Sequence, residues 1–486
     1  AFDTGIQFQI REVCGYLMEK YYLAVDIGAS SGRHILGHLE NGKIELEEIY
    51  RFENGMDHKD GKLLWDVNRL FGEIVAGMKK CKELGKIPVS MAIDTWAVDY
   101  VLLDENDRIL GDTYGYRDHR TDGMDLETAK ILSETELYAR TGIQKQIFNT
   151  IYQLMAVKQQ TPEFLNQAKT LLMLPDYFGF RLTGNKLSEY TNGSTTQLVD
   201  PETFQWDKDL IQKLGYPESI FLPLQMPGTK VGQLLPEIQK EVGFDLEVVL
   251  CGSHDTASAV MAVPQTEGDG IYISSGTWSL MGIESLTPII NEDAAAANFT
   301  NEGGYDHRFR FLKNIMGLWM IQSVRHEYKD AYSFAQLCDM AEESKEFPSR
   351  VDVNDQSFLS PDSMVEAIKQ YCRKTGQPVP ETVGELASVV YRSLAQSYGE
   401  TVSGLEKIAG RTYDSIHIIG GGSNAAYLNQ LTADATGKTV YAGPGEATAI
   451  GNLLAQMIHA KELADLKSAR KCVRKSFEIK TFIPAK

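Results

Sequence analysis

The run Asp26-Ile27-Gly28-Ala29-Ser30-Ser31-Gly32-Arg33 combines residue types that suit the binding of a phosphate chain. Glycine permits close approach of the backbone, serine hydroxyls donate hydrogen bonds, and Arg33 can neutralise phosphate oxygens. Asp26 could hold a hydrated Mg²⁺, a cation that prefers carboxylates and keeps several waters. Taken alone, the run fits equally well a tight turn whose aspartate accepts hydrogen bonds from the backbone.

A second turn of the same kind, Ser275-Gly276-Thr277, lies about half a chain length later. Short apolar runs flank both turns and predict strands, at 21–27 and 34–39 around the first and at 270–274 and 278–283 around the second. The glycine loops of P-loop and dinucleotide-binding proteins instead open a helix. The pattern therefore favours two related halves, each with a hairpin whose backbone N–H groups form an anion site.

The segment Gly252-Ser253-His254-Asp255-Thr256 follows the apolar run 248–250, which predicts a strand, a turn and the start of a helix. Phosphoryl transfer to an alcohol needs a carboxylate that orients the hydroxyl and accepts its proton. Asp255 is the candidate for this base, with His254 and Thr256 lining the acceptor pocket. Two other interpretations stay open, namely Ser253 or Asp255 as a helix N-cap and His254 as a structural histidine.

Three further segments are less specific. Gly420-Gly421-Gly422 follows a predicted strand and is either a nucleotide loop or a tight turn into a helix. Segments 94–99 and 116–120 mix polar and aromatic side chains, which suits sugar hydroxyls or else surface salt bridges. No G-x-G-x-x-G run stands between a strand and a helix, and no H-E-x-x-H or clustered Cys/His pattern occurs. Dinucleotide and zinc sites are therefore disfavoured.

Strands alternating with helices predict an α/β protein with helix-covered sheets. Further strands are expected at 43–52, 91–95, 98–103, 416–419 and 440–442, and helices at 63–84, 384–408, 425–436 and 447–459. The polar segment 330–380 is expected to be a surface insert with helices.

The chain has 486 residues with 48 lysines and arginines against 66 aspartates and glutamates, a net charge of −18. This length suits two large domains, and the acidity excludes a general nucleic-acid binder and disfavours an anionic membrane surface. Six scattered cysteines without a C-x-x-C pair predict reduced thiols. No apolar run approaches 18 residues, and the N-terminal segment does not resemble a signal peptide. We therefore expect a cytoplasmic protein.

The two hairpin turns and the triple-glycine loop resemble the phosphate and adenosine elements of the actin/Hsp70/sugar-kinase ATPase superfamily. Segments 175–184 and 189–192 resemble the FGGY carbohydrate kinases, and the runs 253–260, 274–282, 300–304 and 314–319 are similar to the rhamnulokinase group of that family. The match extends from about residue 22 to residue 459. It implies two actin-like ATPase (ribonuclease-H-like) domains, 21–263 and 264–486, with an interdomain active-site cleft, and an N-terminal extension, 1–20, outside the fold.

The resemblance also implies that ATP and Mg²⁺ are used to phosphorylate the 1-hydroxyl of L-rhamnulose in L-rhamnose catabolism. The base then falls on Asp255, and Asp26 would hold Mg²⁺ through water. The nucleotide contacts fall on Ala29, Ser30, Ser31, Gly32, Arg33, Thr277, Gln322 and Gly421, and the sugar contacts on Ala97, His254, Asp255, Thr256 and Asn314.

Ala97 stands where the family pattern D-T-W-G has glycine, and an added methyl group in a sugar pocket changes selectivity by about 1–3 kcal/mol. L-fuculose or another ketose is therefore an alternative substrate. An actin/Hsp70-like ATPase switch without a sugar is an alternative of another class. The expected partners are a small ketose and MgATP, with no nucleic acid and no membrane, and both a monomer and a homo-oligomer stay open.

Overall fold

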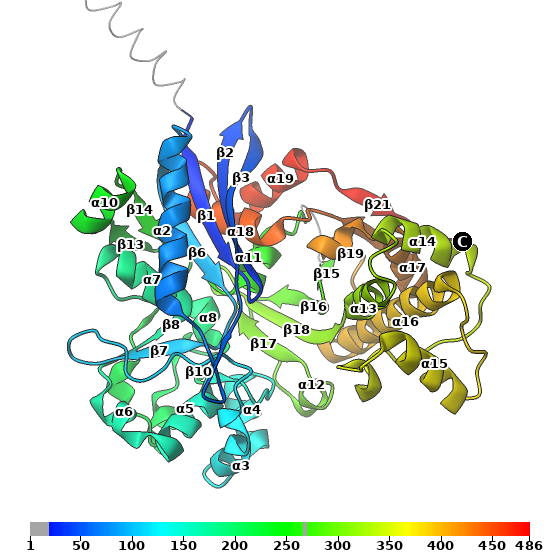
Figure 1. The fold of residues 1–486 in the computed structure, drawn as a ribbon, viewed down its shortest axis with the longest axis horizontal. Helices are drawn as coiled ribbons and strands as arrows, with labels where there is room; N and C mark the ends of the chain where they lie inside the picture. Colours follow the sequence, from blue (N-terminus) through cyan, green and yellow to red (C-terminus); the bar gives the residue numbers. More distant parts are fainter. Residues whose placement is uncertain (1–18, 266–269) are drawn as a thin grey trace, which may run out of the picture.

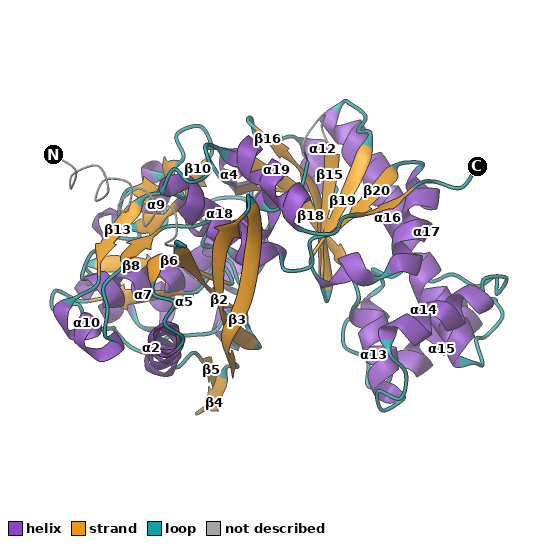
Figure 2. Cartoon of the chain, turned by 90° about the horizontal axis from the view of Figure 1, so that it is seen from above, coloured by secondary structure: helices purple, strands orange, loops and turns teal. Residues whose placement is uncertain are grey.

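Two sheets flanked by helices form the body of the protein, in a computed structural model that describes residues 19–265 and 270–486 (Figures 1 and 2). The first sheet has the order β13-β14-β6-β1-β2-β3 and the second the order β17-β18-β16-β15-β19-β20-β21. The strands of the first sheet are β1 Tyr21–Ile27, β2 Ser31–Glu40, β3 Lys43–Glu53, β6 Pro88–Thr95, β13 Lys230–Gln233 and β14 Glu247–Val249. Those of the second are β15 Gly270–Ser275, β16 Trp278–Ser285, β17 Thr300–Gly303, β18 Phe309–Met316, β19 Ser415–Ile419, β20 Thr439–Ala442 and β21 Lys480–Phe482.

Helices lie on both sheets, and short strand pairs extend the first half of the chain. The helices up to residue 265 are α2 Val67–Glu83, α3 Met124–Ala129, α4 Glu134–Thr141, α5 Thr150–Gln160, α6 Pro162–Gln167, α7 Leu174–Thr183, α8 Tyr190–Ser194, α9 Lys208–Lys213, α10 Pro236–Val242 and α11 Asp255–Met261. Those from residue 270 are α12 Glu292–Ala296, α13 Trp319–Glu327, α14 Phe334–Glu343, α15 Met364–Lys374, α16 Val383–Ala409, α17 Ala426–Thr436, α18 Ala447–His459 and α19 Leu466–Ser476. The short pairs are β4 Asp57–Lys59 with β5 Lys62–Leu64, β7 Tyr100–Leu103 with β8 Thr170–Met173, β9 Ser188–Glu189 with β12 Leu224–Gln225, and β10 Val199–Asp200 with β11 Gln205–Trp206.

The two predicted hairpins are confirmed, and their surroundings match. β1 pairs antiparallel with β2 and parallel with β6, while β15 pairs antiparallel with β16 and parallel with β19. Each half of the chain therefore repeats the same central arrangement, with a turn at the tip of an antiparallel pair beside a parallel strand.

Two predicted elements begin later in the structure than the sequence pattern indicates. The helix expected at 63–84 begins only at Val67, because the Asp66 side chain accepts the Arg69 N–H as a helix cap, and residues 62–64 form β5. The strand expected at 98–103 begins at Tyr100, because Val98 has a φ of 67° and interrupts it.

The expectation of a surface insert at 330–380 is wrong. Three side chains of this segment are fully buried against apolar side chains of α16 and the second sheet: Leu337 of α14, Phe358 in the connection before α15, and Ile368 of α15. One apolar face on each amphipathic helix is enough to make this segment part of a core, although most of its residues are polar.

Helix α18 lies against the first sheet although it comes from near the end of the chain, and Figure 1 shows it in orange among the blue strands. Leu453 and Met457 of α18 pack with Tyr22, Ala24 and Ile35 of β1 and β2. The contact is also polar, because the buried side-chain amides of Asn452 and Gln456 on α18 donate to the carbonyls of Ala92 at 3.1 Å and Leu23 at 2.9 Å. The two halves thus share a core.

Among the described residues, no helix combines the length and the apolar character needed to cross a membrane. The cysteines in the described part, Cys81, Cys251, Cys338, Cys372 and Cys472, are free thiols, as expected. The predicted extension, 1–20, lies outside the described residues up to position 18.

Candidate active site

Asp255 is the first residue of α11, at the point where the loop after β14 turns into a helix. Its Oδ1 accepts the Thr256 N–H at 2.8 Å, and 30 % of its side chain is exposed. His254, and neither Ser253 nor Asp255, takes the N-cap position. Burial of most of the carboxylate, together with the negative charge of Asp26, raises the pKa of Asp255 to about 7. A carboxylate with this pKa is suited to accept a proton near neutral pH.

The loop before Asp255 is held by the buried carboxylate of Glu189. Glu189 Oε2 accepts the Ser253 hydroxyl at 2.5 Å and the Ser253 N–H at 3.2 Å, and it also accepts the Thr191 hydroxyl at 2.7 Å. The Ser253 carbonyl in turn accepts the Thr95 N–H at 2.9 Å, at the end of β6. Since each group is buried and paired, the loop has one well-defined conformation.

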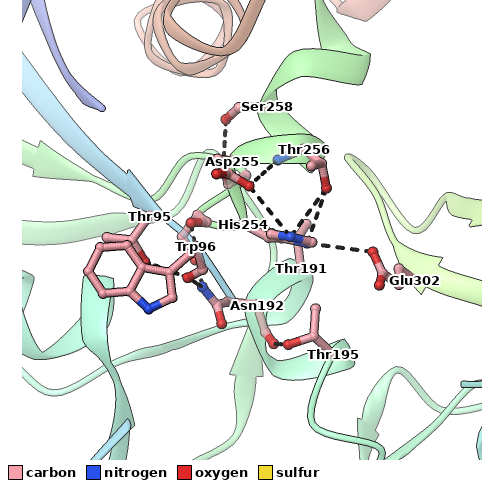
Figure 3. A network of polar contacts seen from close by, with 12 residues as sticks. Thr95, Trp96, Thr191, Asn192, Thr195, His254, Asp255, Thr256, Ser258 and Glu302 are labelled. Carbon is pink, nitrogen blue, oxygen red and sulfur yellow. Dashed lines mark hydrogen bonds and ion pairs between the residues drawn. The ribbon is translucent and has the colours of Figure 1, made fainter. Parts of the chain in front are cut away.

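His254 lies between the base and the second sheet, as Figure 3 shows. Its Nε2 is 3.5 Å from Asp255 Oδ1 and its Nδ1 is 3.6 Å from Glu302 Oε2. Burial and the neighbouring Arg310 guanidinium hold the pKa of His254 well below its usual range, so the ring is neutral. His254 is therefore more than a structural histidine buried in a core, because it contacts the candidate base directly.

A cavity of about 210 Å³ opens beside His254, between the two halves of the chain. Four of the five predicted sugar contacts line it, namely Ala97, His254, Thr256 and Asn314. The fifth, Asp255, is the neighbour of two lining residues. The other walls are apolar or carry single polar groups, and include Trp96, Tyr116, Gln144, Phe148, Asn149 and Glu302.

The polar and aromatic segment 94–99 does not form surface salt bridges. Asp99 is buried and accepts the indole N–H groups of Trp65 at 2.6 Å and Trp96 at 3.0 Å, together with the Gln153 amide at 3.0 Å. These bonds fix the Trp96 ring, and Trp96 and Ala97 form one wall of the cavity.

A larger cavity, of about 1080 Å³, lies wholly in the second half. Gly276, Gln322 of α13 and Gly421 line it, so the second hairpin and the triple-glycine loop meet at one site. The Thr277 hydroxyl donates to Gln322 Oε1 at 3.2 Å. Gly422 must be glycine here, since a Cβ would lie 1.9 Å from Ser275 Oγ. The loop is thus both a tight turn between β19 and α17 and a wall of this cavity.

The first hairpin turn belongs to the opposite half. Ala29 and Ser30 form its tip, while Ser31, Gly32 and Arg33 begin β2. Arg33 Nη2 is 2.9 Å from Asp26 Oδ2, and Arg33 also pairs with Glu446, which precedes α18. Its guanidinium is therefore held by carboxylates from both halves of the chain in this conformation.

Asp26 is paired in register with Asp94 of β6. Burial and the charge of Asp26 hold the pKa of Asp94 well above its usual range, and Asn452 of α18 donates to Asp94 Oδ2 at 2.7 Å. Asp94 Oδ1 is buried without a hydrogen-bond partner. Within residues 19–265 and 270–486, no group of three or more His, Cys, Asp or Glu side chains is placed to hold a metal ion.

Two polar residues of this site were missed from sequence. Arg310 and Glu302 lie on β18 and β17, within a hairpin that shows no catalytic pattern. The sequence carries one signal, since Glu302 falls in the run 300–304 that resembles the rhamnulokinase group.

Comparison with known proteins agrees with this architecture. Residues 21–262 match the N-terminal domain, and residues 271–460 the C-terminal domain, of the FGGY family of carbohydrate kinases. The chain belongs to the FGGY family of carbohydrate kinases.

The similarity extends over nearly the whole chain. The kinase is 54 % identical to a rhamnulokinase of Halalkalibacterium halodurans, over 96 % of this chain and 99 % of that one. It is 47 % identical to a rhamnulokinase of Bacillus subtilis, over 95 % of each chain. In fold it is similar to a gluconate kinase from Lactobacillus acidophilus, with a TM-score of 0.78 and 17 % identity over 96 % of this chain and 94 % of that one. The expected two-domain sugar-kinase fold is confirmed, and a sugar-free ATPase switch is not favoured.

Proposed function

We propose that this kinase transfers the γ-phosphate of ATP to the 1-hydroxyl of L-rhamnulose, giving L-rhamnulose 1-phosphate and ADP in L-rhamnose catabolism. The observation that carries the proposal is its 42–54 % identity to rhamnulokinases over nearly full length. The cavity beside Asp255 supports it, because an aromatic wall with single polar groups suits a small polyhydroxylated ligand.

In the proposed reaction, Asp255 accepts the proton of the 1-hydroxyl while that oxygen attacks the γ-phosphorus. A new O–P bond forms, the bond from the γ-phosphorus to the bridging oxygen breaks, and ADP leaves with that oxygen. Oδ1 of Asp255 is engaged by the Thr256 N–H, which leaves Oδ2 for the hydroxyl. Ala97, His254, Thr256 and Asn314 would hold the ketose in the 210 Å³ cavity.

ATP would lie in the larger cavity, with its phosphates directed between the two hairpin turns. Thr277, Gln322 and Gly421 would contact it from the second half, and Ala29 to Arg33 from the first. Arg33 would have to exchange its present carboxylate partner Glu446 for phosphate oxygens, which are strong acceptors for a guanidinium.

The residues near the first turn fit a hydrated Mg²⁺. This cation is usually held by one or two carboxylates plus waters and phosphate oxygens, so it needs no larger cluster. Asp26, with the unpaired Oδ1 of its neighbour Asp94, offers such ligands. When bound, Mg²⁺ would neutralise charge on the phosphate chain.

The domain assignment, the location and the partners of the enzyme are part of the same proposal. We assign residues 21–263 to the sugar-binding domain and residues 264–486 to the nucleotide-binding domain, with residues 1–20 outside both. We also propose a cytoplasmic enzyme that works on a small ketose and MgATP, with no nucleic-acid or membrane partner.

A panel of acceptors tests the substrate assignment. ADP release is measured with MgATP and L-rhamnulose, L-fuculose, L-ribulose, D-xylulose or glycerol, each over a range of concentrations. The proposal expects the highest kcat/KM for L-rhamnulose. A higher value for another ketose would replace the substrate, and ATP turnover that no acceptor changes would favour a sugar-free ATPase.

The base is tested by Asp255→Asn, with the exposed Asp209→Asn as a matched control. Loss of the base should lower kcat by about 100-fold or more. Since Asp255 must be ionised to accept a proton, kcat/KM of the wild type should fall about tenfold per pH unit below its pKa of about 7. An Asp255→Asn enzyme within about tenfold of the wild type, or a flat profile down to pH 5, would remove Asp255 from this role.

A further inference from the structure

The side chain of Arg310 is fully buried, although it carries a charge and comes from β18 of the second sheet. It reaches across to the start of α11. Its Nε donates to the Gly303 carbonyl at 2.8 Å, and its Nη1 donates to Thr256 Oγ1 at 2.7 Å. Its Nη2 lies 3.1 Å from Nδ1 of His254 and 3.1 Å from Oε2 of Glu302. Every nitrogen of the guanidinium thus faces a partner.

These contacts determine which nitrogen of His254 carries the proton. A guanidinium has donors and no acceptor, so Nδ1 of His254 must be the acceptor in the contact with Arg310. Because the ring is neutral, its single proton then lies on Nε2. Nε2 is 3.5 Å from Asp255 Oδ1, whereas Thr256 Oγ1 is 3.3 Å from both ring nitrogens and does not distinguish them.

We propose that Arg310 is a positioning residue for the phosphoryl-transfer site: by donating to Nδ1 of His254 and to Thr256, it fixes the Nε2–H tautomer of His254 and directs this N–H toward Oδ1 of Asp255. Asp255 Oδ1 accepts the Thr256 N–H at 2.8 Å and lies 3.5 Å from Nε2 of His254, so both donors favour one orientation of the carboxylate, in which Oδ2 is left for the sugar hydroxyl. The role of Asp255 as base rests on the function proposed above, whereas the tautomer of His254 does not.

Glu302 completes this arrangement. A buried guanidinium without a carboxylate would be costly, and Glu302 Oε2 supplies the negative charge from the adjacent strand β17. The charged groups that act most strongly on Asp255 are Asp26 from β1, Arg310 from β18 and Glu302 from β17, and Asp94 of β6 also interacts with it. Arg310 is the cation among them, so it also offsets the carboxylates around the base.

A purely structural role for Arg310 is the alternative, because its bond to the Gly303 carbonyl ties β17 to β18. The two roles differ in what they predict. A structural residue changes stability and leaves the His254 tautomer and the kcat of the folded enzyme unchanged, whereas a positioning residue changes both.

The test compares Arg310→Met with the double variant Glu302→Gln/Arg310→Met, which removes both charges of the pair and so avoids an unpaired buried carboxylate. Glu302→Gln alone is the reference for the double variant, because Glu302 lines the sugar cavity. Arg308→Met is the matched control, since the Arg308 side chain contacts the carbonyls of residues 305 and 306 and the Asp306 side chain and, within the described residues, none of the partners of Arg310.

The first measurement is the ¹⁵N NMR spectrum of the His254 ring in the full-length enzyme without substrate, assigned with a His254→Gln variant. We expect a protonated Nε2 and an unprotonated Nδ1 in the wild type and in Arg308→Met. In Arg310→Met and the double variant we expect a mixture of tautomers or a protonated ring.

The second measurement is kcat at saturating ketose and ATP, normalised to folded enzyme. We expect Arg310→Met to lose about 100-fold, the cost of a misplaced catalytic group, and the double variant to lose as much relative to Glu302→Gln. KM for ATP should stay unchanged, and Arg310→Lys should recover part of the loss because lysine retains a donor.

A wild-type His254 with its proton on Nδ1, or a double variant whose kcat equals that of Glu302→Gln, would overturn the proposal. If a different ketose proves to be the substrate, the same measurements apply with that ketose, so the assignment of Arg310 can stand when the substrate assignment fails.

Discussion

Gly451 lies where α18 of the second half packs closely against α11, the helix that begins with the proposed base Asp255. It lies on α18, and an added Cβ would be 1.6 Å from the carbonyl oxygen of Ser258 on α11. Real Cβ contacts stay beyond 3.0 Å, so Gly451→Ala must separate the two helices by about 1.4 Å. The obstacle is backbone, so no side-chain rotation relieves it. Ser258 stands one helical turn after Asp255, and the displacement therefore reaches the proposed base.

We expect two effects of Gly451→Ala. Overpacking should lower the free energy of unfolding by about 1–3 kcal/mol, measured by urea denaturation at 25 °C. Displacement of the base by more than 1 Å should lower kcat of the folded enzyme about 100-fold, measured as ketose-dependent ADP release. Gly404→Ala is the matched control, because Gly404 also lies in a helix but a Cβ there meets no atom within 4 Å. This change should stabilise the protein by about 0.5–1 kcal/mol.

The reasoning would be refuted if Gly451→Ala unfolded at the same urea concentration as the wild type and turned over at a similar rate. A loss of stability with full kcat would show instead that the helices adjust without moving the base.

Three further predictions concern other parts of the molecule. Asn452→Ala removes the donor to the Ala92 carbonyl and to Asp94 Oδ2. Because these buried acceptors lose their partner, the free energy of unfolding should fall by about 1–3 kcal/mol, and an unchanged urea midpoint would contradict this. Burial lowers the pKa of His34 to about 4 in the folded protein. As the pH falls through 6.5, the unfolded state therefore protonates its histidine first, and the free energy of unfolding decreases between pH 6.5 and 4 by up to about 1.4 kcal/mol per pH unit. His34→Gln should remove this part of the pH dependence in urea titrations at pH 7 and 5, and an identical slope would argue against it. Ala97→Gly should change the ratio of kcat/KM between L-rhamnulose and L-fuculose by about 10- to 200-fold at most, and a larger change would mean that the methyl group does more than fill space.

Local pattern was enough to predict the two hairpins and helix α18. Both hairpins have strong sequence signals, because apolar runs end at glycine and serine turns, and α18 was placed at 447–459 as observed. Asp255 could be proposed as the base because the residue types around it and the start of a helix coincide in one segment.

Side chains that act through tertiary contact could not be predicted in the same way. Arg310 lies in a strand of ordinary composition, and its partners His254 and Thr256 precede it by more than 50 residues. Only the pairing of β17 with β18, and the docking of that hairpin on α11, brings them together. The burial of helices α14 and α15 within 330–380 could not be predicted for a similar reason, since a mostly polar composition does not show which face of a helix packs against other elements of the fold.

The position of α18 has a consequence for how the chain is made. Tyr22, Ala24 and Ile35 are among the first described residues to leave the ribosome, yet the side chains that cover them belong to residues 449–457. Domains usually fold in turn as they are synthesised, but here the first sheet keeps one bare apolar face until almost all of the described chain has emerged. A fragment that stops at residue 263 would carry that face permanently, and it should bind chaperones or aggregate where the full-length protein does not.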